Sequence, residues 1–94
     1  MPPEVIADGK PSPAVDIYSL GVIAYEMLTA QKPFAGDSPM DTMRKILNDD
    51  PLPPIELAPG IPSRLNELVL KMLEKNSIDR PDAREVLAIL VTLR

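Results

Sequence analysis

The most apolar stretch of the chain runs from residue 15 to residue 30 and has helical spacing. At about 100° per residue its apolar side chains form two stripes on opposite sides of a helix. Ser19 and Glu26 interrupt the run before it reaches the roughly 20 apolar residues of a membrane span. The pattern therefore predicts a central helix that the rest of this chain, or a missing partner, must cover. One stripe holds Ile17, Leu20, Ala24, Met27 and Leu28, and the other holds Val15, Tyr18, Val22 and Tyr25.

A shorter amphipathic helix is predicted from Pro39 to about Asn48. Ser38 can accept a hydrogen bond from a free backbone N–H, and proline suits the first helical position. The chain from 50 to 62 then carries five prolines. Because proline lacks a backbone donor, this connector is expected to be extended, without regular structure. The apolar side of the helix holds Met40, Met43, Ile46 and Leu47.

Two further helices are predicted near the end of the chain. Ser63 is expected to cap the first, and Asn76 to follow its end. Asp82 and Glu85 have the spacing of a capping box for the last helix. No segment alternates with period two for long enough to form a strand, so the predicted fold is an all-α small helical bundle. The expected buried stripes are Leu65, Leu68, Val69, Met72 and Leu73, and then Ala83, Val86, Leu87, Leu90 and Leu93.

Composition excludes several classes of function. The 94 residues allow one domain at most, and the net charge of −4 opposes nucleic-acid binding. Without cysteine or histidine the chain has no disulfide, no thiolate chemistry and no usual zinc ligand. The adjacent Asp49 and Asp50 lack the dispersed spacing of a calcium loop and indicate a solvated turn. The N-terminus lacks a secretory pattern, so a cytoplasmic location is expected, with no membrane contact.

Three motifs together resemble the C-terminal part of the large lobe of eukaryotic-type Ser/Thr protein kinases, most closely the bacterial members. Pro3-Glu4 resembles the Ala-Pro-Glu that closes the activation segment, with Pro2 in the alanine position. Asp79-Arg80-Pro81 resembles the Arg-Pro step before the last helix. Residues 1–94 then correspond to a partial kinase domain, from the end of the activation segment to that helix. The central-helix pattern is matched by Asp16, Ser19, Gly21, Pro33 and Phe34, with Tyr18 where the family most often has tryptophan.

The resemblance implies roles for single residues. Glu4 and Arg80 are expected to form a buried ion pair, the alternative being two solvated surface charges. Asp16 anchors the catalytic loop in the complete domain, but in this chain a capping role at the helix start is favoured. Gly21 is expected to permit close packing, and the helix should end near Ala30, where the family often has glycine. The expected core motif is Pro3, Tyr18, Gly21, Pro33 and Phe34, with Tyr25 also in the core rather than in an aromatic ligand box.

The parts that perform kinase chemistry have no counterpart in the sequence. A phosphate-binding loop, a strand lysine, a catalytic Asp with its Asn and an Asp-Phe-Gly metal site are all required. In the family these parts precede the segment that resembles this chain. The sequence thus predicts no catalytic, cofactor-binding or metal-binding residue here, with ATP and Mg²⁺ bound only by the complete parent domain. The chain by itself is expected to be inactive.

Three functional hypotheses remain open. The chain is either the scaffold and substrate-docking part of a kinase domain, with the remainder of that domain as its partner, or a stand-alone interaction module derived from one. A module would self-associate, for example as a homodimer, or bind another protein. An unrelated helical adaptor would require three accidental motif matches. Docking of a protein substrate is expected on the helix from residue 39, through Met40, Met43, Arg44 and Leu47.

Overall fold

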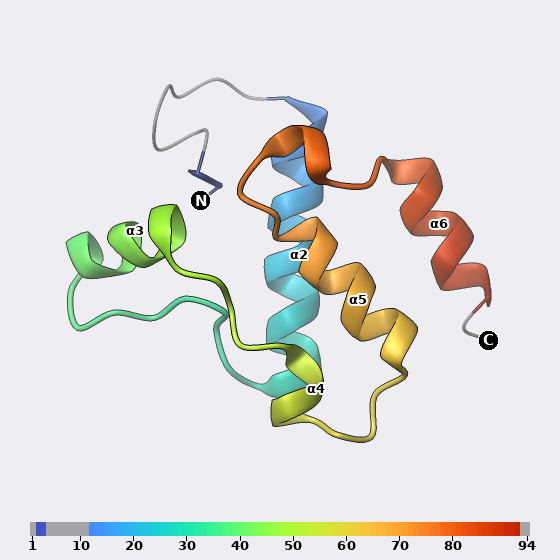
Figure 1. Ribbon diagram of the computed structural model, residues 1–94, viewed down its shortest axis with the longest axis horizontal. Helices are drawn as coiled ribbons and strands as arrows, with labels where there is room; N and C mark the ends of the chain where they lie inside the picture. The colour runs from blue at the N-terminus through green and yellow to red at the C-terminus, as the bar shows by residue number, and fades with distance from the viewer. Residues whose placement is uncertain (1, 4–11, 93–94) are drawn as a thin grey trace.

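The computed structural model describes residues 2–3 and 12–92, and within these ranges the chain contains helices and no strand. The predicted all-α class is thereby confirmed for this part of the chain. Figure 1 shows the helices in their order along the chain. They are α2 (Pro13–Thr29), α3 (Pro39–Asn48), α4 (Pro54–Leu57), α5 (Ser63–Met72), the 3₁₀ helix η1 (Ser77–Asp79) and α6 (Ala83–Thr92).

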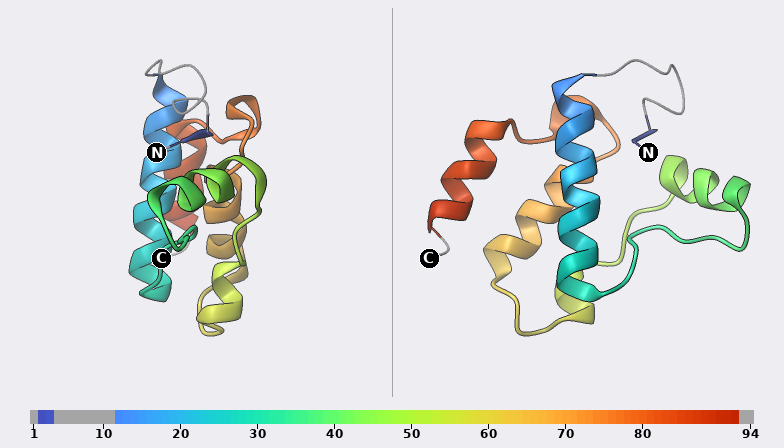
Figure 2. Two further views of the ribbon diagram at one scale, coloured as in Figure 1. Left: turned by 90° about the vertical axis from the view of Figure 1, so that its left-hand side faces the viewer. Right: turned by 180° about the vertical axis from the view of Figure 1, so that it is seen from behind.

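Within the described residues, the other helices pack against one side of α2. α5 packs across α2, and α4 contacts both of them near one end. α3 and α6 lie on opposite sides of this central pair, and the two views in Figure 2 agree on that placement. The described molecule measures 38 × 27 × 16 Å. Within the described ranges, no helix has both the length and the apolar character required to cross a bilayer.

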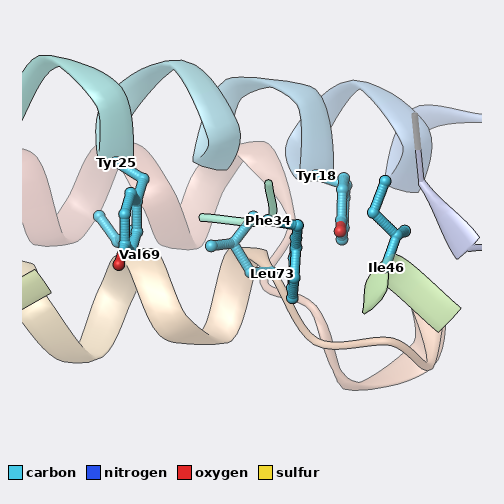
Figure 3. Packing of buried hydrophobic residues seen from close by; sticks show 6 residues of the cluster. All are labelled: Tyr18, Tyr25, Phe34, Ile46, Val69 and Leu73. Carbon is cyan, nitrogen blue, oxygen red and sulfur yellow. The ribbon is translucent and has the colours of Figure 1, made fainter. Parts of the chain in front are cut away.

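The core lies where α2 faces α5. Tyr18, Tyr25 and Phe34 are buried in one cluster, as the core interpretation of these aromatics predicts. Figure 3 shows them between α2 and the side chains contributed by α3 and α5. The second cluster joins Ile17 of α2 to Val86 of α6. The remaining buried members are Ile46, Val69 and Leu73 in the first cluster and Leu68 and Met72 in the second.

Gly21 sets the distance between α2 and α5. A Cβ atom at this position would lie 2.8 Å from Met72 Cβ and 3.3 Å from Leu73 Cδ2. Carbon atoms in ordinary contact are separated by about 3.5–4.0 Å. Only glycine therefore allows the two helices to cross at this distance, and the predicted role in close packing is confirmed.

Several predicted helix ends are confirmed, and the predicted caps at Ser63 and Asp16 are wrong. Ser38 caps α3, since its hydroxyl accepts from Asp41 N–H at 3.1 Å. Asp82 Oδ1 accepts from Glu85 N–H at 2.8 Å, as the capping box predicts. Ser63, by contrast, is the first residue of α5, which begins after Pro62 without a side-chain cap. The cap of α2 comes from Ser12 rather than Asp16, because Ser12 Oγ accepts from Val15 N–H at 3.3 Å.

The connector contains a helix that the sequence analysis did not predict. α4 begins at Pro54. At the first helical position a backbone N–H would have no partner within the helix, so the N–H that proline lacks is not missed. Asn66 of α5 holds this turn by accepting from Ile55 N–H at 2.9 Å. Four residues are too few to show helical periodicity, so the prolines alone indicated an extended chain. η1 was missed for the same reason, and Asn76 caps it rather than ending α5.

The predicted buried face of α6 is largely wrong. Val86 is buried, but Ala83, Leu87 and Leu90 are exposed, and Leu93 lies outside the described residues. The helix is rotated so that Val86 and Ile89 face α5. Leu87, Leu90 and Val91 lie on the other side of α6 and remain 62%, 44% and 49% exposed.

Replacing Ala30 with glycine is expected to stabilise the fold by about 1 kcal/mol. Ala30 has φ 59° and ψ 19°, the left-handed conformation. Residues with a Cβ atom adopt it at a cost, whereas glycine adopts it freely. The matched control is Ala24→Gly within α2, which should destabilise by about 1 kcal/mol. Urea denaturation of both variants measures the effect. A loss of stability in Ala30→Gly would contradict the strain argument.

Candidate functional site

The outward face of α3 is the candidate docking surface. Met40, Met43 and Leu47 are exposed on it, Met40 by 81%. Ile46 points the other way and is buried in the core cluster. The predicted docking residues therefore share one accessible helix face, with only Ile46 of the predicted apolar side used for packing.

Lys75 fixes the C-terminal end of α3 to the body of the molecule. Its ammonium donates to the Ile46 carbonyl oxygen at 2.9 Å and lies 4.7 Å from the centre of the Phe34 ring. Burial lowers the pKa of Lys75, while the carboxylates of Asp50, Asp49 and Glu74 act in the opposite direction. The sequence analysis missed this lysine. A cation next to the C-terminal carbonyls of a helix is favourable in general, but the two segments are far apart in the sequence.

A network of hydrogen bonds fixes the N-terminal end of α3. Gly36 N–H donates to Thr42 Oγ1 at 2.9 Å, and Asp37 N–H donates to Asp41 Oδ2 at 3.0 Å. Arg44 pairs with Asp41 at 2.9 Å. The hydrogen bonds from Arg44 and from Asp37 N–H lower the pKa of Asp41, and the same pair raises the pKa of Arg44. Within the candidate docking surface, Arg44 is thus already paired with a carboxylate of its own helix.

Arg80 is buried, with 7% of its surface exposed. Among its contacts, Nε donates to the Glu74 carbonyl at 2.8 Å and Nη1 donates to the Ala14 carbonyl at 3.0 Å. Nη2 donates to the Lys75 carbonyl at 3.4 Å. The guanidinium also lies 4.8 Å from the centre of the Tyr18 ring. Arg80 therefore joins the start of α2 to the segment after α5, and a solvated surface role is wrong for it.

The other predicted site residues are only partly tested by the geometry. Glu4 lies outside the described residues, so its ion pair with Arg80 stays a prediction. Asp16 is exposed on the first turn of α2. Within the core motif Pro3, Tyr18, Gly21 and Phe34 are buried, and Pro33 is half-buried.

Tyr25 connects α2 to the connector and makes this contact sensitive to pH. Its hydroxyl donates to the Leu52 carbonyl at 2.7 Å. Burial, and then the charge of Glu56, raise the pKa of Tyr25 above its ordinary value. The folded state therefore holds this proton more tightly than the unfolded state. The stabilisation is fully present below about pH 10 and is lost as pH rises through the folded-state pKa.

The variant Tyr25→Phe tests this contact. At neutral pH it is expected to lower the free energy of unfolding by about 1 kcal/mol, the value of one hydrogen bond. The difference from the unchanged protein should shrink as pH rises above about 10, because the unfolded tyrosine then ionises first. Urea denaturation from neutral to alkaline pH measures it. A difference that stays constant over that range would contradict the assigned direction.

The residues that could hold a metal or nucleotide are not gathered anywhere in the described structure. Within residues 2–3 and 12–92, no three side chains of Asp, Glu, His or Cys lie together as a metal site. Asp49 and Asp50 are exposed next to the proline-rich connector. Gly21 is packed inside a helix and Gly36 against α3, so neither belongs to an open phosphate loop.

Comparison with known proteins finds similarity to protein kinases, both in a family model and in single relatives. The family model described as "Protein kinase domain" matches residues 1–90. The chain is 38% identical over 80 residues to a probable serine/threonine-protein kinase of Clostridium perfringens, covering 84% of this chain and 12% of that protein. It is 45% identical over 65 residues to the serine/threonine-protein kinase PknB of Mycobacterium leprae, covering 69% of this chain and 10% of that protein.

A solved structure shows the same arrangement of helices. The twitchin kinase region from C. elegans superimposes with a TM-score of 0.81 and 26% sequence identity. The alignment covers 93% of this chain and 15% of that chain. The aligned part of this chain spans 12% and 10% of the lengths of the two bacterial relatives described above.

Proposed function

Because the chain belongs to the protein kinase domain family, we propose that it forms the C-terminal part of the large lobe of a Ser/Thr protein kinase domain. In this proposal the complete domain transfers a phosphoryl group from ATP to Ser or Thr of proteins. The present chain supplies the scaffold and a surface for protein substrates. The predicted boundaries, from the end of the activation segment to the last helix, are part of the proposal, as is the cytoplasmic location.

The match of the protein kinase domain model to residues 1–90 carries this proposal, and an exposed apolar face on α2 supports it. Leu20, Ile23 and Met27 recur at helical spacing, and Met27 is 81% exposed. They lie beside the buried face that holds Tyr18, Gly21 and Tyr25. A central helix that presents such a face requires a partner, since large exposed apolar patches are rare in independent proteins. The remainder of the kinase domain is the partner we propose.

The described residues do not suit the cofactors of the complete enzyme. ATP and Mg²⁺ need a phosphate loop, a lysine and carboxylate ligands held together. The glycines and carboxylates described above are dispersed and do not form such a set. We therefore assign to this chain only binding and positioning roles. These are the proposed Glu4–Arg80 pair, the proposed contact of Asp16 with the catalytic loop, and the α3 surface.

The decisive experiment begins with the DNA upstream of the codon for Met1. If an open reading frame continues there in frame, the whole domain is expressed and tested for Mg²⁺-dependent phosphorylation of Ser or Thr in a protein substrate. We expect activity from the whole domain and none from the 94-residue chain. A stop codon directly upstream, or an inactive whole domain with intact catalytic motifs, would contradict the proposal.

A stand-alone interaction module is the second candidate, and the same uncovered face supports it. In this candidate two copies of the chain would cover the α2 face of each other. For this candidate, light scattering after size exclusion is expected to show a dimer, and Ile23→Lys is expected to convert it to a monomer. A monomer at all concentrations, together with an upstream reading frame, leaves only the first candidate.

Substitution of Met43 by aspartate tests the proposed docking role of α3 in the complete kinase. Met43 is exposed and belongs to neither of the two buried clusters, so the fold should be kept. A charge in an apolar interface should raise KM for a protein substrate about tenfold and leave kcat unchanged. Phosphorylation of a short peptide, which does not reach α3, serves as the control. An equal rise of KM for the protein and the peptide substrate would argue against docking on α3.

A further inference from the structure

A hollow of about 410 Å³ lies beside the C-terminal end of α3. Asp50 and Pro51 line it from the segment after α3, and Glu74 lines it from the segment after α5. Pro53 and Leu70 contribute apolar surface. The hollow thus joins an apolar wall to two exposed carboxylates from different parts of the chain.

Hydrogen bonds fix the main chain on both sides of the hollow. The Glu74 carbonyl accepts from Arg80 Nε at 2.8 Å. Asp49 N–H donates to the Lys45 carbonyl at 2.8 Å, and the Leu52 carbonyl accepts from the Tyr25 hydroxyl at 2.7 Å. The backbone that carries both carboxylates is therefore held before any ligand arrives, which reduces the entropic cost of binding.

The charge at the hollow is negative although Lys75 also lines it. The ammonium of Lys75 is engaged by the Ile46 carbonyl and the Phe34 ring. Three carboxylates, those of Asp49, Asp50 and Glu74, act on this one cation. Among the residues that line the hollow, the two carboxylates of Asp50 and Glu74 outnumber the single ammonium of Lys75, so one negative charge is in excess.

We propose that this hollow binds an arginine side chain presented by a partner protein. The methylene groups of arginine would lie on Pro53 and Leu70, and the guanidinium would bridge the carboxylates of Asp50 and Glu74. Arginine suits this geometry because its planar group presents several donors and its stem is apolar. An acidic partner would be repelled, and a purely apolar one would leave both carboxylates without a ligand.

The experiment is an NMR titration of the ¹⁵N-labelled 94-residue chain with a capped pentapeptide of alanine and proline that has one central arginine. We expect saturable shifts at the amides of Asp50, Leu70 and Glu74. The same peptide with citrulline, which keeps the shape but is neutral, should bind about tenfold more weakly. Absence of saturable shifts, or equal binding of both peptides, would overturn the proposal.

Variants of exposed carboxylates separate this site from general attraction to an acidic protein. Glu74→Gln and Asp50→Asn should each weaken binding of the arginine peptide about tenfold. Glu67→Gln makes the same change of charge outside the hollow and should leave the affinity unchanged. Equal losses in all three variants would show non-specific charge attraction and refute the site. The titration needs no kinase activity, so its failure leaves the proposed function untouched.

Discussion

Replacement of Arg80 by alanine is expected to destabilise the protein by about 3 kcal/mol or more, a large fraction of the total stability of a small domain. The change removes the buried guanidinium that donates to the carbonyl oxygens of Ala14 and Glu74 and so ties two segments together. It also removes the cation that covers the Tyr18 ring. Each buried polar group left without a partner costs about 1–3 kcal/mol. The start of α2 and the segment after α5 should then separate.

The matched control for this prediction is Arg44→Ala. Arg44 is exposed and forms its ion pair with Asp41 of its own helix, so its removal should change stability little. Urea denaturation followed by circular dichroism compares the two variants at one protein concentration. A conservative Arg80→Lys change should recover only part of the loss, because one ammonium cannot reach carbonyls on both segments. Equal stability of the two alanine variants would contradict the structural role of Arg80.

Replacement of Gly21 by valine is expected to destabilise the fold by about 3 kcal/mol. The first added carbon already meets Met72 Cβ at 2.8 Å, and this atom is attached to the α5 backbone and cannot turn away. The two branches of valine enlarge the overlap, so α5 must move away from α2. The gain in helix propensity over glycine, below about 1 kcal/mol, is too small to offset this cost.

Gly60 gives the control for this substitution. A Cβ atom there would meet nothing within 4 Å, so Gly60→Ala should leave the melting temperature nearly unchanged. Gly21→Ala should fall between Gly60→Ala and Gly21→Val, since it adds one carbon to the overlap and gains helix propensity. Thermal denaturation of the three variants gives the ranking. A valine variant as stable as the unchanged protein would mean that the helices do not cross at Gly21.

The sequence predicted the elements that have long periodic patterns and missed those that do not. Regular spacing predicts the buried positions of α5, which are Leu68, Val69 and Met72, and that of Leu73 directly after it. α4 has four residues and left no such pattern. The face of α6 was mispredicted because Leu87 and Leu90 are as apolar as Val86. Periodicity ranks apolar positions, but only the partner helix decides which of them are covered.

For the candidate site, the resemblance to a family motif predicted more than the chemical types of the residues did. It identified Arg80 as buried, but its contacts with the carbonyls of Ala14 and Glu74 carry no sequence signal, since every residue has a carbonyl. The contact of Lys75 with Ile46 spans 29 positions and was equally invisible. The exposed face of α3 was predictable, because its residues sit on one short amphipathic helix.

α3 contributes to the folded core through Ile46 alone among its residues. Its outward residues can consequently be exchanged during evolution with little loss of stability. Drift at positions 40, 43 and 47 would then alter which proteins are recognised while the scaffold beneath stays constant. Related chains that differ mainly at these positions would be expected to have diverged in their choice of partner.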